Sequence, residues 1–201
     1  MHFRVIKFST KALKAAIIKI SIIFGREGRK LMAYTFDEFC DDCRETLLEK
    51  PNKEGHKKLV VLLERFLKNK NFITEQLSPE AKPGRPIIFQ DPETGFCIQN
   101  HIHGRVGSGP PHDHGSSWAV YGQAVGCTGM TEYLRKDDGQ KEGFAELEIL
   151  RKFNMNAGEA GLFDVGEIHS IRVVPGGRVV RITGTNLDKL GHKVYNLEKK
   201  E

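Results

Sequence analysis

No apolar run in this chain of 201 residues is long enough to cross a membrane as a helix, which takes about 20 residues. The most apolar stretch, residues 15–24, is too short and is interrupted by Lys19 and Ser21. No clear small-residue cleavage site of a secretory signal follows it. We therefore expect a soluble protein without a membrane span.

Cysteine is also scarce, and its spacing suits neither a disulfide framework nor a structural zinc site. Of the four cysteines, Cys40 and Cys43 lie three residues apart on a predicted helix, where both face the core. No second Cys-x-x-Cys pair exists to complete a zinc site. Buried thiols in a reducing compartment are the expected state, which favours a cytoplasmic protein.

An excess of positive charge is confined to the first 32 residues. The formal net charge is +5, but this segment has eight Lys or Arg and one acidic residue, so the remainder carries −2. The remainder also lacks interleaved basic and aromatic residues, which disfavours nucleic-acid binding. We expect residues 1–32 to be a disordered basic extension, with a membrane-surface segment or a targeting leader as the alternatives.

Residues 33–201 are expected to form a single domain that opens with two or three helices over residues 35–77. Thr35 and Glu38 form a capping box that predicts a helix to Glu49. Pro51-Asn52 ends it, and further helices are predicted over residues 53–68 and 71–77. Apolar residues recur on one face of the first two helices, so these should pack as a layer on the rest of the domain. They are Phe36, Phe39, Cys40, Cys43, Leu47 and Leu48, then Leu59, Leu62, Leu63, Phe66 and Leu67.

From Pro86 onward the hydrophobic pattern takes the two-residue period of strands. Turn signals such as Asp138-Gly139 and Pro175-Gly176-Gly177 separate the strands. Many short strands with glycine-bearing turns predict an all-β core of barrel or jelly-roll type over residues 85–197. The predicted strands span residues 87–90, 96–104, 116–124, 129–136, 145–153, 160–163, 169–174, 178–183 and 192–197.

The sequence around His112 and His114 predicts a metal site. The two histidines leave a proline-rich turn and lead into an apolar run. On a strand, side chains two residues apart point to the same face, so both imidazoles converge. Imidazole is a ligand that suits Fe, Zn, Cu and Ni alike. The intervening Asp113 should point to the opposite face, away from the metal.

A second histidine motif lies further along the chain. Gly158 is followed after five residues by Asp164, then by Gly166 and, after two more residues, by His169. With the His-x-His pair and Gly126, these spacings resemble the two motifs of the cupin superfamily of small β-barrel metalloproteins. The resemblance implies a cupin double-stranded β-helix, that is, a jelly-roll barrel preceded by helices.

The departures from the cupin motifs are informative. Ala119 stands where the metal-binding Glu would be, Asp164 replaces a Pro and Val173 replaces an Asn. Without the Glu, the ligands are three neutral histidines, His112, His114 and His169. That set is similar to the thiol dioxygenases, the family of cysteine dioxygenase and its bacterial mercaptopropionate relatives, over roughly residues 35–190. It implies a mononuclear non-heme Fe(II) site at which O2 oxidises a small thiol, cysteine-like or a mercapto acid, to a sulfinic acid.

Three further residues are candidates for the reaction. Arg85, 27 residues before His112, resembles the family's arginine that pairs with the substrate carboxylate; a surface arginine is the alternative. His103 shares a strand face with His101, so the two could line the pocket, add a ligand, or be ordinary solvated histidines. Tyr121 could wall the pocket, as could Trp118, or either could belong to the core.

The last core strand departs most from the thiol dioxygenases. The family's Ser-x-His-x-Tyr pattern corresponds to the run from Arg181 to Thr185, which has neither the His nor the Tyr. Thr183, Thr185 or His192 could fill the polar role. Two other functions therefore stay open: a cupin metalloenzyme for another small organic substrate, and a non-enzymatic cupin that binds a small ligand. A monomer or a homodimer is expected.

Overall fold

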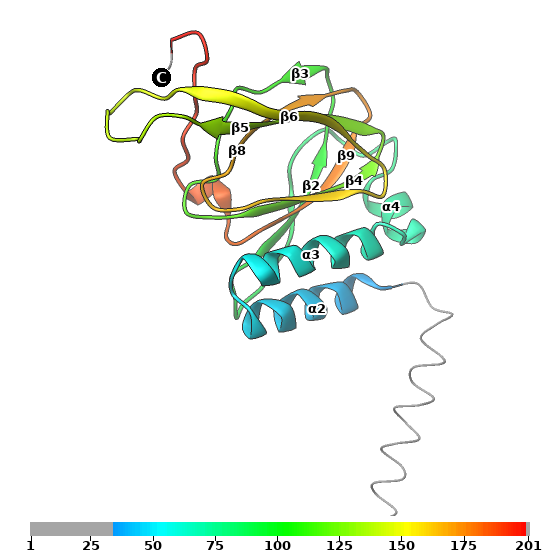
Figure 1. Ribbon diagram of the computed structural model, residues 1–201. Coiled ribbons are helices and arrows are strands. Elements are labelled where there is room, and N and C mark those ends of the chain that lie inside the picture. Colours follow the sequence, from blue (N-terminus) through cyan, green and yellow to red (C-terminus); the bar gives the residue numbers. More distant parts are fainter. Residues whose placement is uncertain (1–33, 200–201) are drawn as a thin grey trace, which may run out of the picture. The chain divides into compact units, whose positions relative to one another are not determined.

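Two antiparallel sheets form the core of the computed structural model, which describes residues 34–199 (Figure 1). The five-stranded sheet has the order β1-β2-β9-β4-β7, and the four-stranded sheet has the order β3-β8-β5-β6. The strands are β1 (Ile87–Gln90), β2 (Cys97–Ile102), β3 (Gly107–Ser108), β4 (Ala119–Val125), β5 (Cys127–Arg135), β6 (Leu147–Asn156), β7 (Ala160–Phe163), β8 (Ile168–Val173) and β9 (Arg178–Thr183).

This strand order defines a jelly roll. Apart from β1, each sheet has four strands, β2-β9-β4-β7 and β3-β8-β5-β6, so strands adjacent in space are mostly distant in sequence. Strands β2 and β9 are buried at every residue, because helices cover one face of their sheet and the second sheet faces the other. The predicted fold class, an all-β jelly-roll core with N-terminal helices, is confirmed.

Three helices precede the strands in the described chain: α2 (Phe36–Glu49), α3 (Lys53–Phe66) and α4 (Lys70–Gln76). The capping box of Thr35 and Glu38 is present at the start of α2. Helix α3 lies against β4 and β7, and α2 packs on α3 (Figure 1). The rings of Phe39 and Phe66 stack between the two helices with their centroids 4.4 Å apart. The helices therefore cover the outer face of the five-stranded sheet.

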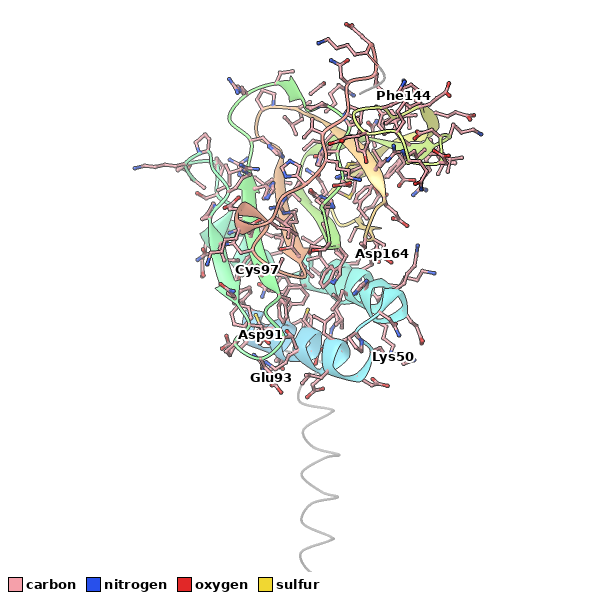
Figure 2. All side chains as sticks on the ribbon, turned by 90° about the vertical axis from the view of Figure 1, so that its left-hand side faces the viewer. Lys50, Asp91, Glu93, Cys97, Phe144 and Asp164 are labelled. Carbon is pink, nitrogen blue, oxygen red and sulfur yellow. The ribbon has the colours of Figure 1, made fainter. Side chains whose placement is uncertain are left out.

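A buried carboxylate ties α2 to the turn between β1 and β2. Asp91 is 1% exposed and accepts hydrogen bonds from the backbone and hydroxyl of Thr94. Asp91, which is labelled in Figure 2, also accepts a hydrogen bond from Nε of Arg44 at 2.6 Å. This ion pair fixes the turn against α2. The hydrogen bonds from Thr94 and the charge of Arg44 hold the pKa of Asp91 below its usual value, although burial opposes them.

Gly122 sets the distance between α3 and the sheet. A Cβ atom at this position would lie 2.6 Å from Cδ2 of Leu63 and 3.0 Å from Cδ1 of Leu67. Gly122→Ala should therefore overpack the core and lower the free energy of unfolding by about 1–3 kcal/mol, measured by urea denaturation. Gly161→Ala is the matched control, because a Cβ at Gly161 meets no atom within 4 Å. Equal stabilities of the two variants would contradict this account of the packing.

The structure corrects three details of the prediction. Residues 192–197 form no strand, and only Val194 makes an isolated bridge, to His112. Leu48 is 52% exposed rather than buried with the rest of its helix face. The two-residue strand β3 was not predicted.

No helix within residues 34–199 is long and apolar enough to cross a membrane. The predicted basic extension lies outside the described residues.

Candidate metal centre

The side chains of His112, His114 and His169 converge, with one ligand atom from each lying within 4.8 Å of the others. His114 and His169 are buried, and their Nε2 atoms are 3.3 Å apart. Two nitrogens that bind one ion at about 2.0–2.1 Å lie about 2.8–3.4 Å apart for angles of about 90–109°. The observed spacing therefore fits two nitrogens that share one metal ion.

The backbone holds two of the ligands in register. The amide of His112 donates to the carbonyl of His169 at 2.8 Å, and the amide of His169 donates back at 3.0 Å. The carboxylate of Asp113 accepts the amides of Gly115 and Lys193, each at 2.9 Å. Asp113 is thus occupied in fastening the C-terminal segment beside the ligand loop and does not join the histidine group.

Hydrogen bonding and packing orient the rings. Nδ1 of His112 donates to the carbonyl of Pro110 at 3.0 Å, which leaves Nε2 with a free lone pair for a metal ion. Nδ1 of His114 and of His169 is buried and has no partner in the described chain. The centroid of the Phe163 ring lies 3.9 Å from that of His169, so packing fixes that ring.

Burial keeps the candidate ligands unprotonated. It lowers the pKa of His114 to about 3 and that of His169 well below its ordinary value, with the other histidines and Arg181 adding in the same direction. Burial also lowers the pKa of His112, although the hydrogen bond to Pro110 opposes it. Metal ions bind neutral imidazole, so these environments favour binding over protonation.

The same shifts make the metal-free protein sensitive to acid. His101, His114 and His169 stay neutral when folded and gain protons near pH 6.5 when unfolded, so each favours unfolding as pH falls below that value. Each should remove about 1.4 kcal/mol of stability per pH unit from about pH 6 downward. Urea denaturation of apoprotein at pH 7 and pH 5 measures this loss. His101→Leu should reduce the slope by one proton, and a flat profile would contradict the burial.

A cavity of about 650 Å³ lies beside the histidine group. His112, Tyr121, His101 and Arg181 line it, and the hydroxyl of Tyr121 is 3.2 Å from Nε2 of His114. A smaller cavity of about 250 Å³ is also lined by His112 and Arg181, and in addition by His114. The metal-binding group therefore has space for a small ligand next to it.

Arg181 is the residue that sequence reasoning missed. It lies on β9, is 6% exposed, donates to the side-chain oxygen of Gln99, and has a second nitrogen 3.4 Å from the hydroxyl of Tyr121. Its Nε has no partner, and it makes no ion pair within residues 34–199. An arginine inside the apolar run Val179-Val180-Arg181-Ile182 was the available signal, because a buried strand rarely carries an unpaired charge.

Four of the residues considered from the sequence line the larger cavity, and their side chains are buried to different extents. Tyr121 and His101 are buried in the cavity wall, and His101 Nε2 is buried without a partner. His103 is half-buried in the same wall, while Arg85 is exposed and lines both cavities. Trp118 lies elsewhere, in the core against the helices.

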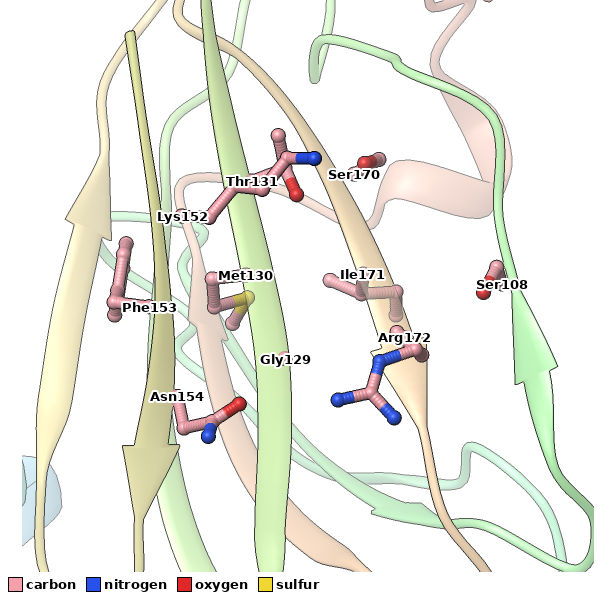
Figure 3. Close-up of a pocket in the computed structure, with 10 residues that line it drawn as sticks. All are labelled: Ser108, Gly129, Met130, Thr131, Lys152, Phe153, Asn154, Ser170, Ile171 and Arg172. Carbon is pink, nitrogen blue, oxygen red and sulfur yellow. The ribbon is translucent and has the colours of Figure 1, made fainter. Parts of the chain in front are cut away.

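A groove of about 440 Å³ on the four-stranded sheet is separate from this group (Figure 3). Cross-strand pairing places Gly129 between Arg172 and Asn154, and Thr131 between Ser170 and Lys152. Gly129 therefore lies within the groove, between the side chains of Arg172 and Asn154. None of the three histidines lines it.

No model of a known protein family matches the sequence, and no curated protein matches it. Similar solved structures include KdgF from Halomonas sp. (16% identity, TM-score 0.37, 49% of this chain and 74% of that chain). They also include a cupin superfamily protein from Desulfitobacterium hafniense DCB-2 (14%, 0.38, 53% and 84%) and hydroquinone 1,2-dioxygenase PnpCD (12%, 0.41, 55% and 69%). At these identities and TM-scores, no function is transferred from those proteins to this chain. The chain's own strand order and histidines define its class, a jelly-roll protein with a three-histidine metal-binding group.

Proposed function

We propose that this protein is an Fe(II)-dependent dioxygenase that converts a small thiol carrying a carboxylate to a sulfinic acid. The main supporting observation is that His112 of the three-histidine group lines a cavity whose charged lining residues are all cationic: Arg85, Arg105 and Arg181. An anionic substrate complements such a lining. The balanced reaction adds both atoms of O2 to the sulfur and retains its proton in the acid, R–SH + O2 → R–SO2H.

The histidines would hold the iron, and the iron when bound would supply oxygen activation and acidify the thiol. Arg181 would bind the substrate carboxylate, because a planar guanidinium can donate hydrogen bonds to both carboxylate oxygens at once. Its position is fixed by Gln99 and Tyr121, so the substrate would be oriented as it binds. Tyr121, whose hydroxyl adjoins His114, would donate a hydrogen bond to the substrate beside the metal group.

The test is oxygen uptake by protein loaded with iron under anaerobic conditions. 3-Mercaptopropionate and cysteine should consume one O2 per thiol and give a sulfinic acid identified by mass spectrometry. Cysteamine, which lacks the carboxylate, should react much more slowly, and 3-hydroxypropionate should not react. Iron bound at one per chain without uptake with any thiol would refute the proposal.

A metalloenzyme for another small carboxylate is the second candidate. The observation that favours it is Arg181 itself, which stands where the thiol dioxygenases carry their Ser-x-His-x-Tyr pattern. The cationic cavity would still select an acid, but the sulfur would no longer be required. In the same assay, uptake with carboxylates that lack a thiol would support this alternative.

A further inference from the structure

We propose that the protein has a second ligand site, between its helices and the five-stranded sheet, that binds a small uncharged aromatic molecule carrying a hydroxyl group. The site is a pocket of about 340 Å³. It shares no lining residue with the two cavities beside the histidines. The residues that line it are Leu47, Leu48, Pro51, His56, Glu93, Thr94, Phe96, Trp118 and Gly184.

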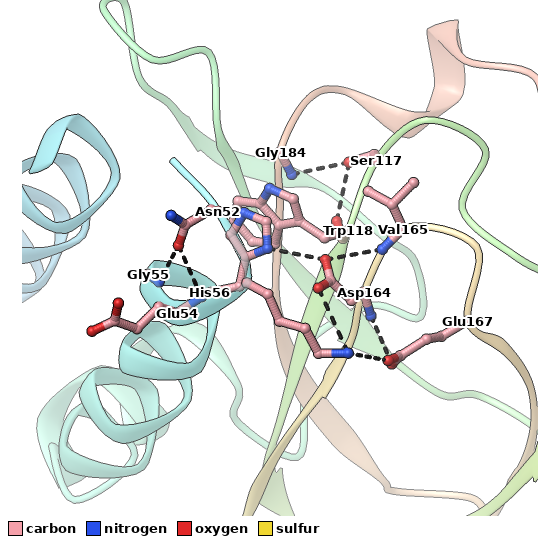
Figure 4. A network of polar contacts seen from close by, with 11 residues as sticks. Asn52, Glu54, Gly55, His56, Ser117, Trp118, Asp164, Val165, Glu167 and Gly184 are labelled. Carbon is pink, nitrogen blue, oxygen red and sulfur yellow. Dashed lines mark hydrogen bonds and ion pairs between the residues drawn. The ribbon is translucent and has the colours of Figure 1, made fainter. Parts of the chain in front are cut away.

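His56 gives the pocket a fixed hydrogen-bond acceptor. This residue of α3 is 7% exposed, and its Nδ1 lies 3.0 Å from Oδ1 of Asp164 (Figure 4). A carboxylate only accepts, so Nδ1 carries the proton of this contact, and in the corresponding tautomer of imidazole Nε2 has a free lone pair. No hydrogen bond engages Nε2 within the described chain, and this atom is not sealed from solvent. The carboxylate of Asp164 pairs with Nζ of Lys53 at 4.0 Å, and the backbone amide of Asp164 donates to the carboxylate of Glu167 at 2.9 Å.

Trp118 gives the pocket an aromatic wall and a donor. Its ring lies against that of His56, with centroids 4.5 Å apart and planes 30° apart. A Cβ at Gly184 would lie only 2.8 Å from Nε1 of Trp118, so this glycine makes room for the indole. The indole N–H makes no hydrogen bond to any residue within 34–199 and is not sealed from solvent.

The class of ligand follows from these groups. Phe96, Leu47 and Trp118 are buried apolar surfaces, which suit a flat ring. A hydroxyl both donates and accepts, so one such group could donate a hydrogen bond to the free Nε2 of His56 and accept one from the free N–H of Trp118. The only charged group of fixed sign in the lining is Glu93, which disfavours an anion. A phenol has all of these properties, whereas the metal cavity with its three arginines selects acids.

The experiment uses the full chain, with 4-ethylphenol and ethylbenzene as probes. Trp118 is the only tryptophan in the sequence, so its emission reports this pocket alone. We expect saturable changes in emission, with 4-ethylphenol binding about tenfold more tightly, the equivalent of about one net hydrogen bond. Ethylbenzene is the smaller and more apolar compound, so neither steric exclusion nor hydrophobicity can produce this preference. No saturable change, or equal binding of the two, would overturn the proposal.

Two variants locate the binding. His56→Phe keeps the aromatic contact with Trp118 and removes the acceptor, so the preference for 4-ethylphenol should fall to about onefold. Retention of the preference would overturn the role of His56. Leu48→Glu changes an exposed residue of the lining and leaves the His56–Asp164 contact intact, so the variant should still fold. It should weaken both compounds several-fold, and unchanged affinities would show that they bind elsewhere.

Discussion

Replacing Arg181 by methionine should stabilise the protein and at the same time remove most of its activity. Arg181 is 6% exposed and its guanidinium has no carboxylate partner in the described chain, so the folded state bears the cost of burying a charge. Arg181→Met should raise the free energy of unfolding by about 1–3 kcal/mol. It should lower kcat/KM for 3-mercaptopropionate by about 100-fold or more, because the substrate carboxylate loses its charged partner.

Urea denaturation and oxygen uptake on the same preparations measure the two effects. Arg85→Met is the matched control, because it removes an arginine that is exposed at the cavity. It should change the free energy of unfolding little, and it should lower kcat/KM by less than Arg181→Met does. Turnover of cysteamine, which has no carboxylate, should be nearly the same in Arg181→Met and the unchanged protein. Full activity toward 3-mercaptopropionate in Arg181→Met, or a loss of stability, would contradict the assigned role.

Replacing His169 by alanine should abolish stoichiometric metal binding. The three histidines supply one nitrogen each, and the variant keeps only two of them. Changes to residues that merely support a ligand weaken metal binding by about 10–100-fold, so loss of a ligand should exceed about 100-fold. Elemental analysis after dialysis against a weak chelator measures the bound iron per chain.

His192→Ala provides the control for that measurement. His192 is exposed, and its ring centroid lies 6.2 Å from that of His112. It belongs to the same neighbourhood but not to the converging group, so its variant should keep one metal ion per chain. Equal retention of metal by both variants would mean that the three histidines are not the ligands.

Local patterns explain why much of the fold could be predicted. The capping box at Thr35 and the two-residue period after Pro86 act over a few residues and therefore appear in the sequence. The His112-x-His114 motif is equally local and could be read from the sequence, although the structure places both residues before β4 rather than on a strand as expected. Residues 192–197 carry a similar alternation but find no neighbouring strand except at Val194, so the local pattern alone did not decide their structure.

Contacts between distant segments explain what could not be predicted. Arg181 reaches Gln99, 82 residues earlier, because β9 pairs with β2 across the jelly roll. His56 and Asp164 are 108 residues apart and meet only after α3 has packed on the sheet. Nothing within a few residues of any of these side chains indicates its partner. The candidate metal ligands were therefore accessible from the sequence, whereas the contacts of Arg181 and the separate pocket lined by His56 and Trp118 were not.

The reciprocal backbone pairing of His112 with His169 bears on how the protein acquires its metal. Because main-chain hydrogen bonds already hold these two residues together, metal binding need not supply the energy of folding, unlike in a zinc finger. We therefore expect the apoprotein to be folded and able to exchange one ion for another. Imidazole is a ligand for iron, nickel, copper and zinc alike, and affinity generally rises from manganese to copper, so the three histidines do not by themselves select iron. The ion that a cell delivers, more than the shape of the site, would then decide which metal the protein carries.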